Sequence, residues 1–201
     1  MILRRDFGSY EAYVHAQGGK ARGRGPELAA SRPAQTKGFV AVLRESPPHL
    51  KPGRVLCLGA RTGAEVDAFQ RYGFKGSVGI DLHPLAKDVQ VGDWHSMPEF
   101  SDGSFDNVYS NSFDHCLYPE KACAEITRIL SPGGRFYLMA SDKGLKDDER
   151  AAKWQESKKH NEAIYWQRAE ELRDLVLGLG FRMKKQWKGG VWTHFVMEPK
   201  R

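Results

Sequence analysis

The chain has 201 residues, of which 40% are hydrophobic and 28% charged, and its formal net charge is +6. This length suits one α/β domain with a sizeable core and excludes such a domain together with a second independent one. No run of about 18 apolar residues is present, so no membrane span is expected, and the first residues lack the apolar stretch of a secretory signal. We therefore expect a soluble, cytoplasmic protein.

Residues 1–53 are expected to form a basic N-terminal extension, which carries nine Lys/Arg against four Asp/Glu. Apolar residues at helical spacing in 7–17 predict a short helix that could act as a lid. The glycine-rich, basic residues 18–26 are expected to be flexible, either as a solvated loop or in contact with an anionic substrate. A second helix is predicted around residues 39–43 and should end before Pro47.

Strand and helix patterns alternate from residue 54 to the end of the chain. The predicted strands are 54–59, 77–81, 88–91, 105–110, 135–141, 182–188 and 192–198, and the predicted helices are 63–72, 119–130 and 163–178. This alternation is typical of a parallel sheet with helices on both faces, and Gly189-Gly190 predicts an antiparallel hairpin at the end. We predict an α/β domain over residues 54–201 with a Rossmann-like, doubly wound, mostly parallel seven-stranded sheet. The charged stretch 141–159 is interpreted as a solvated helix, with a contribution to a substrate pocket as the alternative.

A glycine-bounded turn joins the first strand to the first helix of this domain. The apolar residues 55–58 lead into Gly59-Ala60-Arg61-Thr62-Gly63. Glycines let the backbone approach a ligand closely, and the helix N-terminus offers free N–H groups to it. Asp81 ends the next apolar run, where doubly wound folds place an acid for ribose hydroxyls. These features predict a nucleotide-cofactor site, and the missing middle glycine of Gly-x-Gly-x-x-Gly counts against a nicotinamide cofactor.

Across residues 54–199 the chain resembles the class I S-adenosylmethionine (SAM)-dependent methyltransferases, whose first strand runs into Val-Leu-Asp-Leu-Gly-Cys-Gly-Thr-Gly. Residues 55–63 match this motif, and further matches follow in the family's order at 79–81, 92–94, 104–111 and 129–136. Within this class the chain is similar to the type-11-like branch. Two residues depart from the pattern, because Cys57 replaces the usual acid of the first strand and Arg61 replaces the middle glycine.

The resemblance implies SAM as the cofactor. Gly59, Ala60 and Gly63 would pass close to its methionine moiety. Asp81 would accept hydrogen bonds from the ribose, and Asp93 with Trp94 would hold adenine. The full set of expected cofactor-binding residues is Gly59, Ala60, Arg61, Thr62, Gly63, Asp81, Leu82, Asp93, Trp94 and Asn111. Arg61 could reach the cofactor carboxylate or instead form a structural ion pair, and Trp94 could simply fill the core.

Asn111, Asp114 and His115 are the candidate catalytic residues, because they follow the strand 105–110 where the family's fourth motif lies beside the transferred methyl group. Methyl transfer requires an aligned nucleophile and, for a hydroxyl or amine, loss of a proton. His115 is the expected general base, and Asp114 would orient it or act alone. The alternatives are a structural His115 and catalysis by alignment, in which Asn111 positions the acceptor.

The cysteines and histidines do not suggest a metal or a disulfide framework. Cys57, Cys116 and Cys123 are an odd number without Cys-x-x-Cys spacing, and the seven histidines include no pair at i, i+4. We expect no metal site.

The sequence predicts transfer of a methyl group from SAM to a hydroxyl or amine of a small-molecule or glycan-type acceptor. The basic extension keeps an RNA methyltransferase open as an alternative, although the Asn/Asp-Pro-Pro-Tyr/Phe motif of base-amino methylation is absent. A second alternative is a non-catalytic SAM-binding protein, in which Cys57 and Arg61 mark a degraded site. No oligomeric state is predicted.

Overall fold

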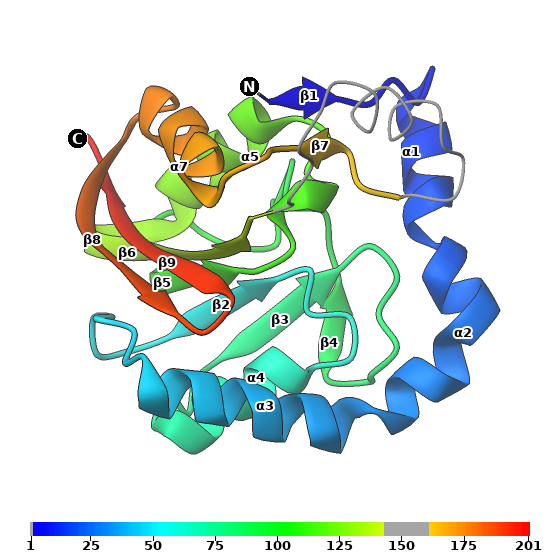
Figure 1. Cartoon of the computed structure of the whole chain (residues 1–201), viewed down its shortest axis with the longest axis horizontal. Coiled ribbons are helices and arrows are strands. Elements are labelled where there is room, and N and C mark those ends of the chain that lie inside the picture. The colour runs from blue at the N-terminus through cyan, green and yellow to red at the C-terminus, as the bar shows by residue number, and fades with distance from the viewer. Residues whose placement is uncertain (1, 143–160) are drawn as a thin grey trace.

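The computed structural model describes residues 2–142 and 161–201, so most of the charged stretch 141–159 lies outside the described residues. One seven-stranded sheet has the strand order β4-β3-β2-β5-β6-β9-β8 (Figure 1). Its strands are β2 (Val55–Leu58), β3 (Val78–Asp81), β4 (Val89–Val91), β5 (Phe105–Ser110), β6 (Leu130–Ser141), β8 (Phe181–Gly189) and β9 (Trp192–Pro199). Neighbours from β4 to β6 are parallel, and β9 is antiparallel to both β6 and β8. The predicted fold class and C-terminal hairpin are confirmed.

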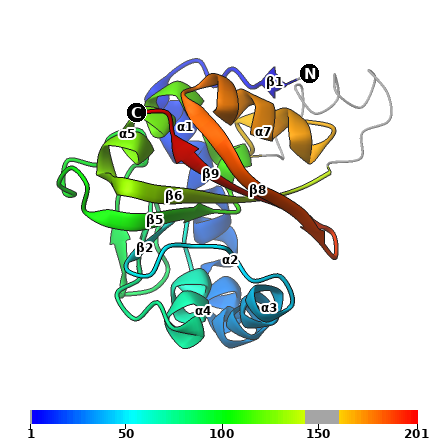
Figure 2. The same cartoon turned by 90° about the vertical axis from the view of Figure 1, so that its left-hand side faces the viewer.

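Helices cover both faces of the sheet (Figure 2). They are α1 (Tyr10–Gln17), α2 (Gly19–Ala30), α3 (Arg32–Glu45), α4 (Ala64–Tyr72), α5 (Pro119–Ile129) and α7 (Ala169–Gly178), with a 3₁₀ turn η1 (Phe113–His115) after β5. Successive side chains of a strand point to opposite faces. In β2, Leu56 and Leu58 therefore join the core under α5 and α7, whereas Val55 and Cys57 join the core under α3 and α4. Because both faces are covered, all four residues of β2 are buried.

The glycine-rich segment 18–26, expected to be a flexible loop, is helical from residue 19 onwards and lies in α2, with Gly18 at its N-cap. Alanines and Leu28 favour the helix, and Arg24 forms an ion pair with Glu27 one turn later. Pro26 has no N–H to donate to the preceding turn, and the helix is kinked at Arg24, whose φ is −135°. The second predicted helix, around 39–43, starts earlier than expected, as α3, and ends before Pro47 as expected.

The N-terminus is attached to the C-terminal half of the chain by a pairing that the sequence did not predict. β1 (Leu3–Arg4) pairs antiparallel with β7 (Ile164–Tyr165), as the upper part of Figure 1 shows. The predicted helix 163–178 therefore begins only at Ala169. Residues 164–166 are β-branched or aromatic, which suits a strand, but their partner is about 160 positions away in sequence. Among the described residues, no helix has the length and apolar character needed to cross a membrane.

Candidate functional site

The glycine turn after β2 lies at the carboxyl edge of the sheet. Gly59 has φ +73° and Gly63 has φ +77°, a region that favours glycine. The N–H groups of Gly59 and Ala60 both donate to the carbonyl oxygen of Ile80, at 2.9 and 3.0 Å. A Cβ on Gly59 would lie 3.1 Å from Cβ of Ser112, so glycine also permits the close approach of the β2 and β5 ends.

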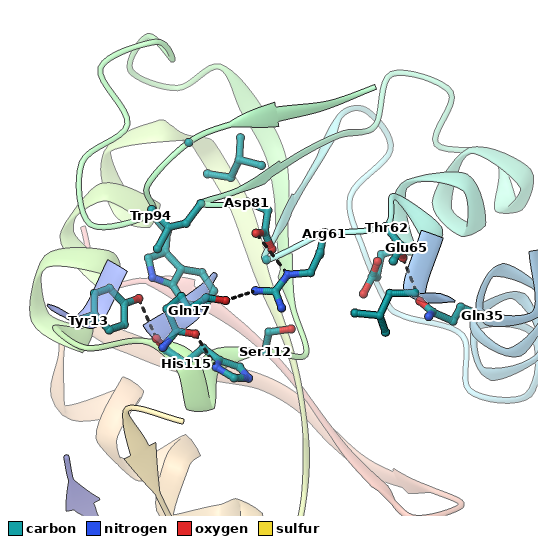
Figure 3. A pocket seen from close by; sticks show the side chains of 15 residues that line it. Tyr13, Gln17, Gln35, Arg61, Thr62, Glu65, Asp81, Trp94, Ser112 and His115 are labelled. Atoms are coloured by element: carbon teal, nitrogen blue, oxygen red, sulfur yellow. Dashed lines mark hydrogen bonds and ion pairs between the residues drawn. The ribbon is translucent and has the colours of Figure 1, made fainter. Parts of the chain in front are cut away.

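A cavity of about 230 Å³ opens beside this turn, where open α/β sheets bind ligands (Figure 3). Its helical cover comes from the N-terminal helices and consists of Tyr13, Gln17, Leu28 and Gln35. Its floor comes from the strand ends and the start of α4, and consists of Gly59, Arg61, Thr62, Glu65, Ile80, Asp81, Leu82, Gly92, Trp94, Ser112 and His115. The predicted residues Gly59, Arg61, Thr62, Asp81, Leu82, Trp94 and His115 thus meet at one cavity. Ala60, Gly63, Asp93, Asn111 and Asp114 lie outside its lining, and every predicted role stays a prediction.

Asp81 and Arg61 are paired across the centre of the cavity. The Asp81 carboxylate accepts a hydrogen bond from the backbone N–H of His83 at 2.7 Å, and Nε of Arg61 lies 3.5 Å from the same oxygen. Nη2 of Arg61 donates to the carbonyl of Gln17 at 3.3 Å. Arg61 therefore adopts the ion pair that was the alternative to cofactor contact. Both of its contacts are long, so they are weak, and its N–H groups remain available to a stronger acceptor.

Asp93 is held by neighbours rather than directed into the cavity. It accepts hydrogen bonds from the backbone and the ring Nδ1 of His95 at 2.9 and 2.7 Å, and from the hydroxyl of Tyr10. Burial alone would raise the pKa of Asp93, but these hydrogen bonds outweigh it and lower the pKa below its ordinary value. Trp94, next in the chain, does line the cavity. Trp94 is also part of the buried core, so its contact with adenine stays a prediction, and Tyr10 ties α1 to this strand end.

His115 lies in η1 beneath α1, with a defined tautomer. Its Nδ1 faces two acceptors, the side-chain oxygen of Gln17 at 2.8 Å and the carbonyl of Asn161 at 3.2 Å. The Gln17 amide nitrogen donates to that same carbonyl at 2.6 Å, which orients its oxygen toward the ring. Nδ1 therefore carries the proton and Nε2 is the basic nitrogen. Tyr13 donates to the carbonyl of His115 at 2.9 Å and fixes the turn from the helical cover.

Asp114 lies outside the cavity lining, near Glu162. One potential ligand atom from each of Asp114, His115 and Glu162 lies within 4.8 Å of the others. Arg5 is also there, since its Nε donates to the carbonyl of Glu162 at 3.1 Å, and burial lowers its pKa while the Glu162 carboxylate opposes that shift. An arginine thus supplies positive charge beside these acids. The expectation of no metal site stays a prediction.

Glu65 is the lining residue that sequence reasoning missed. It lies in the first turn of α4, is 9% exposed, and its Oε2 has no hydrogen-bond partner among the described residues. Burial raises the pKa of Glu65 to about 7, and the charge of Asp81 adds to the rise, while hydrogen bonds from its own backbone and from Asn111 oppose it. The signal was a charged residue next to Val66 and near Phe69, on the buried side of an otherwise amphipathic helix.

The chain is similar to known methyltransferases in sequence and in structure. The sequence model of the methyltransferase domain family matches residues 32–186. A 1,6-didemethyltoxoflavin-N1-methyltransferase from Burkholderia thailandensis, solved with 1,6-didemethyltoxoflavin and S-adenosylhomocysteine, has a TM-score of 0.66 at 15% identity over 100% of this chain and 95% of that one. A SAM-dependent methyltransferase from Thermotoga maritima has a TM-score of 0.65 at 18% identity over 94% and 100%. No protein of curated function matches by sequence.

A third similar structure is a complex between the Trm112 methyltransferase activator and a methyltransferase of Haloferax volcanii, with a TM-score of 0.60 at 21% identity over 96% of both chains. The family match runs from α3 into β8 and so includes most of the cavity. These findings confirm the predicted enzyme class and its cofactor, SAM, while the type-11-like branch and the boundary at residue 53 stay predictions. The chain belongs to the methyltransferase domain family and is a SAM-dependent methyltransferase of class I.

Proposed function

We propose that this enzyme methylates a hydroxyl or amine of a small molecule, with a glycan-type acceptor included, and that His115 removes the acceptor proton. The observation that carries the proposal is the helical cover. The cavity is roofed by three N-terminal helices and its volume is about 230 Å³. This is below the roughly 300–1,000 Å³ of typical small-molecule sites. Because SAM would occupy this cavity, little enclosed space remains for the acceptor, which favours a compact molecule over a polymer chain and supports α1–α3 as a lid.

The lining residues fit SAM by charge. SAM carries a sulfonium, an α-ammonium and an α-carboxylate, so its net charge is about +1 at neutral pH. The floor offers two carboxylates, Glu65 and Asp81, against one guanidinium, Arg61. The side chain of Arg61 is 20% exposed, and Asp81 and Glu65 are buried. Their charges are therefore poorly screened by solvent. The net negative charge of the floor complements the net positive charge of SAM and so supports this cavity as the cofactor site.

When bound, SAM supplies a methyl group on a positively charged sulfur. The acceptor lone pair forms a bond to that carbon as the carbon–sulfur bond breaks, and the electron pair stays on sulfur. Nε2 of His115 would take the proton that the acceptor loses, because Nδ1 is already bonded to Gln17 and Asn161. Gln17 and Tyr13 would hold the ring in this orientation and exclude water from the acceptor side.

The test begins with the mass of any ligand that co-purifies with the protein, followed by transfer of labelled methyl from SAM to small hydroxyl and amine compounds. With an acceptor in hand, His115→Ala should lower the single-turnover rate by about 10²–10⁴ and leave SAM affinity nearly unchanged, because a general base acts on the chemical step. His15→Ala, at an exposed position of α1 outside the lining, is the matched control. A near-wild-type rate for His115→Ala would reject the base and favour alignment, with Asn111 tested next.

RNA is the second candidate acceptor, favoured by the positive charge of residues 1–53. Several of these charges have protein partners, since Arg4 pairs with Glu120, Arg24 with Glu27, and Arg32 with two aspartates. This engagement favours the small-molecule proposal. RNA binding whose affinity falls steeply with salt, together with methyl transfer to that RNA, would reverse the preference.

A further inference from the structure

Glu65 carries the further inference, because it is a buried carboxylate with unused hydrogen-bonding capacity in a cofactor cavity. We propose that Glu65 binds the α-ammonium group of SAM and, with Arg61 on the α-carboxylate, gives the site its recognition of the amino-acid end of the cofactor. The inference rests on the proposed function only in treating this cavity as the cofactor site. It does not depend on the acceptor or on His115.

The place of Glu65 in the cavity points to this end of the cofactor. It lies two residues after Gly63, where the glycine turn becomes α4, close to Thr62 and Gln35 (Figure 3). Trp94 and His115 lie toward the opposite side of the cavity in the same view, with Arg61 between the two groups. A ligand with adenine on Trp94 and ribose on Asp81 would therefore extend its methionine end past Arg61 toward Glu65.

One carboxylate oxygen of Glu65 lacks a donor among the described residues, although the carboxylate also has hydrogen bonds from the Asn111 side chain and from its own backbone. Its Oε2 is buried without a partner, and leaving a buried charged acceptor unsatisfied is costly. The sulfonium of SAM has no N–H group, whereas an ammonium has three. Thr62, the nearest hydroxyl on the turn, already donates to Gln35 at 2.9 Å. The ammonium is thus the part of the cofactor whose chemistry matches the vacant oxygen.

The groups around Glu65 leave it as the negative charge at this position. Asp81 and Arg32 act on it from β3 and α3, and Cys57 and Tyr109 lie close enough that its charge raises their pKa values. Burial is the larger cause of the raised pKa of both Cys57 and Tyr109, so both are neutral. Asp81 is already bonded to His83 and paired with Arg61. The Asn111 side chain and the backbone also hydrogen-bond to Glu65, but Oε2 has no partner among the described residues and can accept from a ligand cation.

The experiment compares two ligands that differ at the proposed contact. S-adenosylhomocysteine keeps the ammonium and carboxylate, whereas 5′-methylthioadenosine has the same nucleoside and thioether without the amino acid. Calorimetry on the full chain should show that Glu65→Gln weakens S-adenosylhomocysteine binding about 10- to 100-fold, the loss for a hydrogen bond between charged groups, with methylthioadenosine affinity unchanged. Glu45→Gln, an exposed position at the end of α3, is the matched control and should bind both ligands as wild type does.

Proton release gives a second readout. Burial raises the pKa of Glu65 to about 7, and an ammonium partner would lower that pKa. S-adenosylhomocysteine should then release a fraction of a proton from the wild type near neutral pH, seen as a buffer-dependent binding enthalpy, and Glu65→Gln should abolish this release.

The outcomes separate the inference from the site on which it rests. Unchanged S-adenosylhomocysteine affinity in a folded Glu65→Gln variant overturns it, as does an equal loss for both ligands, which would mean a distorted cavity. Failure of the wild type to bind methylthioadenosine, or wild-type methylthioadenosine affinity in a folded Trp94→Ala variant, would instead reject the cavity as the nucleoside site and the inference with it. If Glu65→Gln does not fold, Glu65→Asp is used: loss confined to S-adenosylhomocysteine supports the inference, and unchanged S-adenosylhomocysteine affinity contradicts it.

Discussion

The cavity floor and the helical cover enclose one space but are built differently. The floor is continuous with the sheet: the backbone of the glycine turn is bonded to Ile80, and all four residues of β2 are buried. The cover meets the floor through polar side chains, including Tyr10 on Asp93, Gln17 on His115 and Gln35 on Thr62, and the later part of α3 adds apolar packing, through Leu43 and its neighbours. The floor therefore sets global stability and cofactor geometry, whereas the cover can be loosened with a smaller loss of folding free energy.

The largest effect is expected in the floor, at Gly59. Gly59→Val combines a positive φ with contact against Ser112 and should destabilise the protein by about 3–4 kcal/mol while abolishing SAM binding. Gly133 has a similar φ of +71° but open space around it, so Gly133→Val is a matched control that should cost only about 1–2 kcal/mol. Urea unfolding measures both. Equal losses would show that close approach at Gly59 is unimportant.

A smaller effect concerns ligand binding by the floor rather than folding. Asp81→Ala should weaken SAM binding by roughly 1.5–3 kcal/mol, the range for hydrogen bonds to a charged group, because its carboxylate is expected to hold the ribose. Loss of the ion pair with Arg61 contributes little to this change in affinity, because Nε of Arg61 lies 3.5 Å from the Asp81 carboxylate. Asp102→Ala, at a side chain 82% exposed, is the control. Wild-type affinity in folded Asp81→Ala protein, measured by calorimetry, would remove Asp81 from the ribose site.

The smallest effect tests the attachment of the cover through Arg32. This guanidinium of α3 pairs with Asp67 at 2.7 Å and with Asp88 at 2.6 Å, and its hydrogen bonds lower the pKa of both carboxyls. Arg32→Met should cost about 1–2 kcal/mol at neutral pH, discounted for partial exposure. Arg24→Met, which removes a fully exposed pair in α2, should leave the stability nearly unchanged.

The pH dependence of the Arg32 effect follows from the direction of those pKa shifts. Because both aspartates have a lower pKa folded than unfolded, their contribution is fully present above about pH 4–5 and is lost as pH falls through the folded values. The stability difference between wild type and Arg32→Met should therefore shrink below about pH 4. A constant difference from pH 7 to pH 3 would contradict an electrostatic attachment.

The sequence by itself determined the order of strands and helices from residue 54 onwards, the glycine turn and the residues at the strand ends. These features depend on hydrophobic periodicity and on local conformational demands, which neighbouring residues carry. The predicted sheet and hairpin match the structure for that reason. Seven predicted site residues meet at one cavity because parallel strands bring their carboxyl ends to one edge.

Tertiary structure decided which side chains are partnered. The pairing of β1 with β7 joins residues that are far apart in sequence, and Glu65 is buried beside Cys57 although no local pattern marks it. Hydrophobic periodicity therefore reveals neither contact. The same holds for Asp93, whose carboxylate is taken by Tyr10 from a helix more than 80 positions earlier. Spacing along the chain specifies where a residue lies on its own element. The free energy of a buried carboxylate depends instead on the hydrogen-bond donors that distant elements bring to it. Only the folded chain brings those donors together.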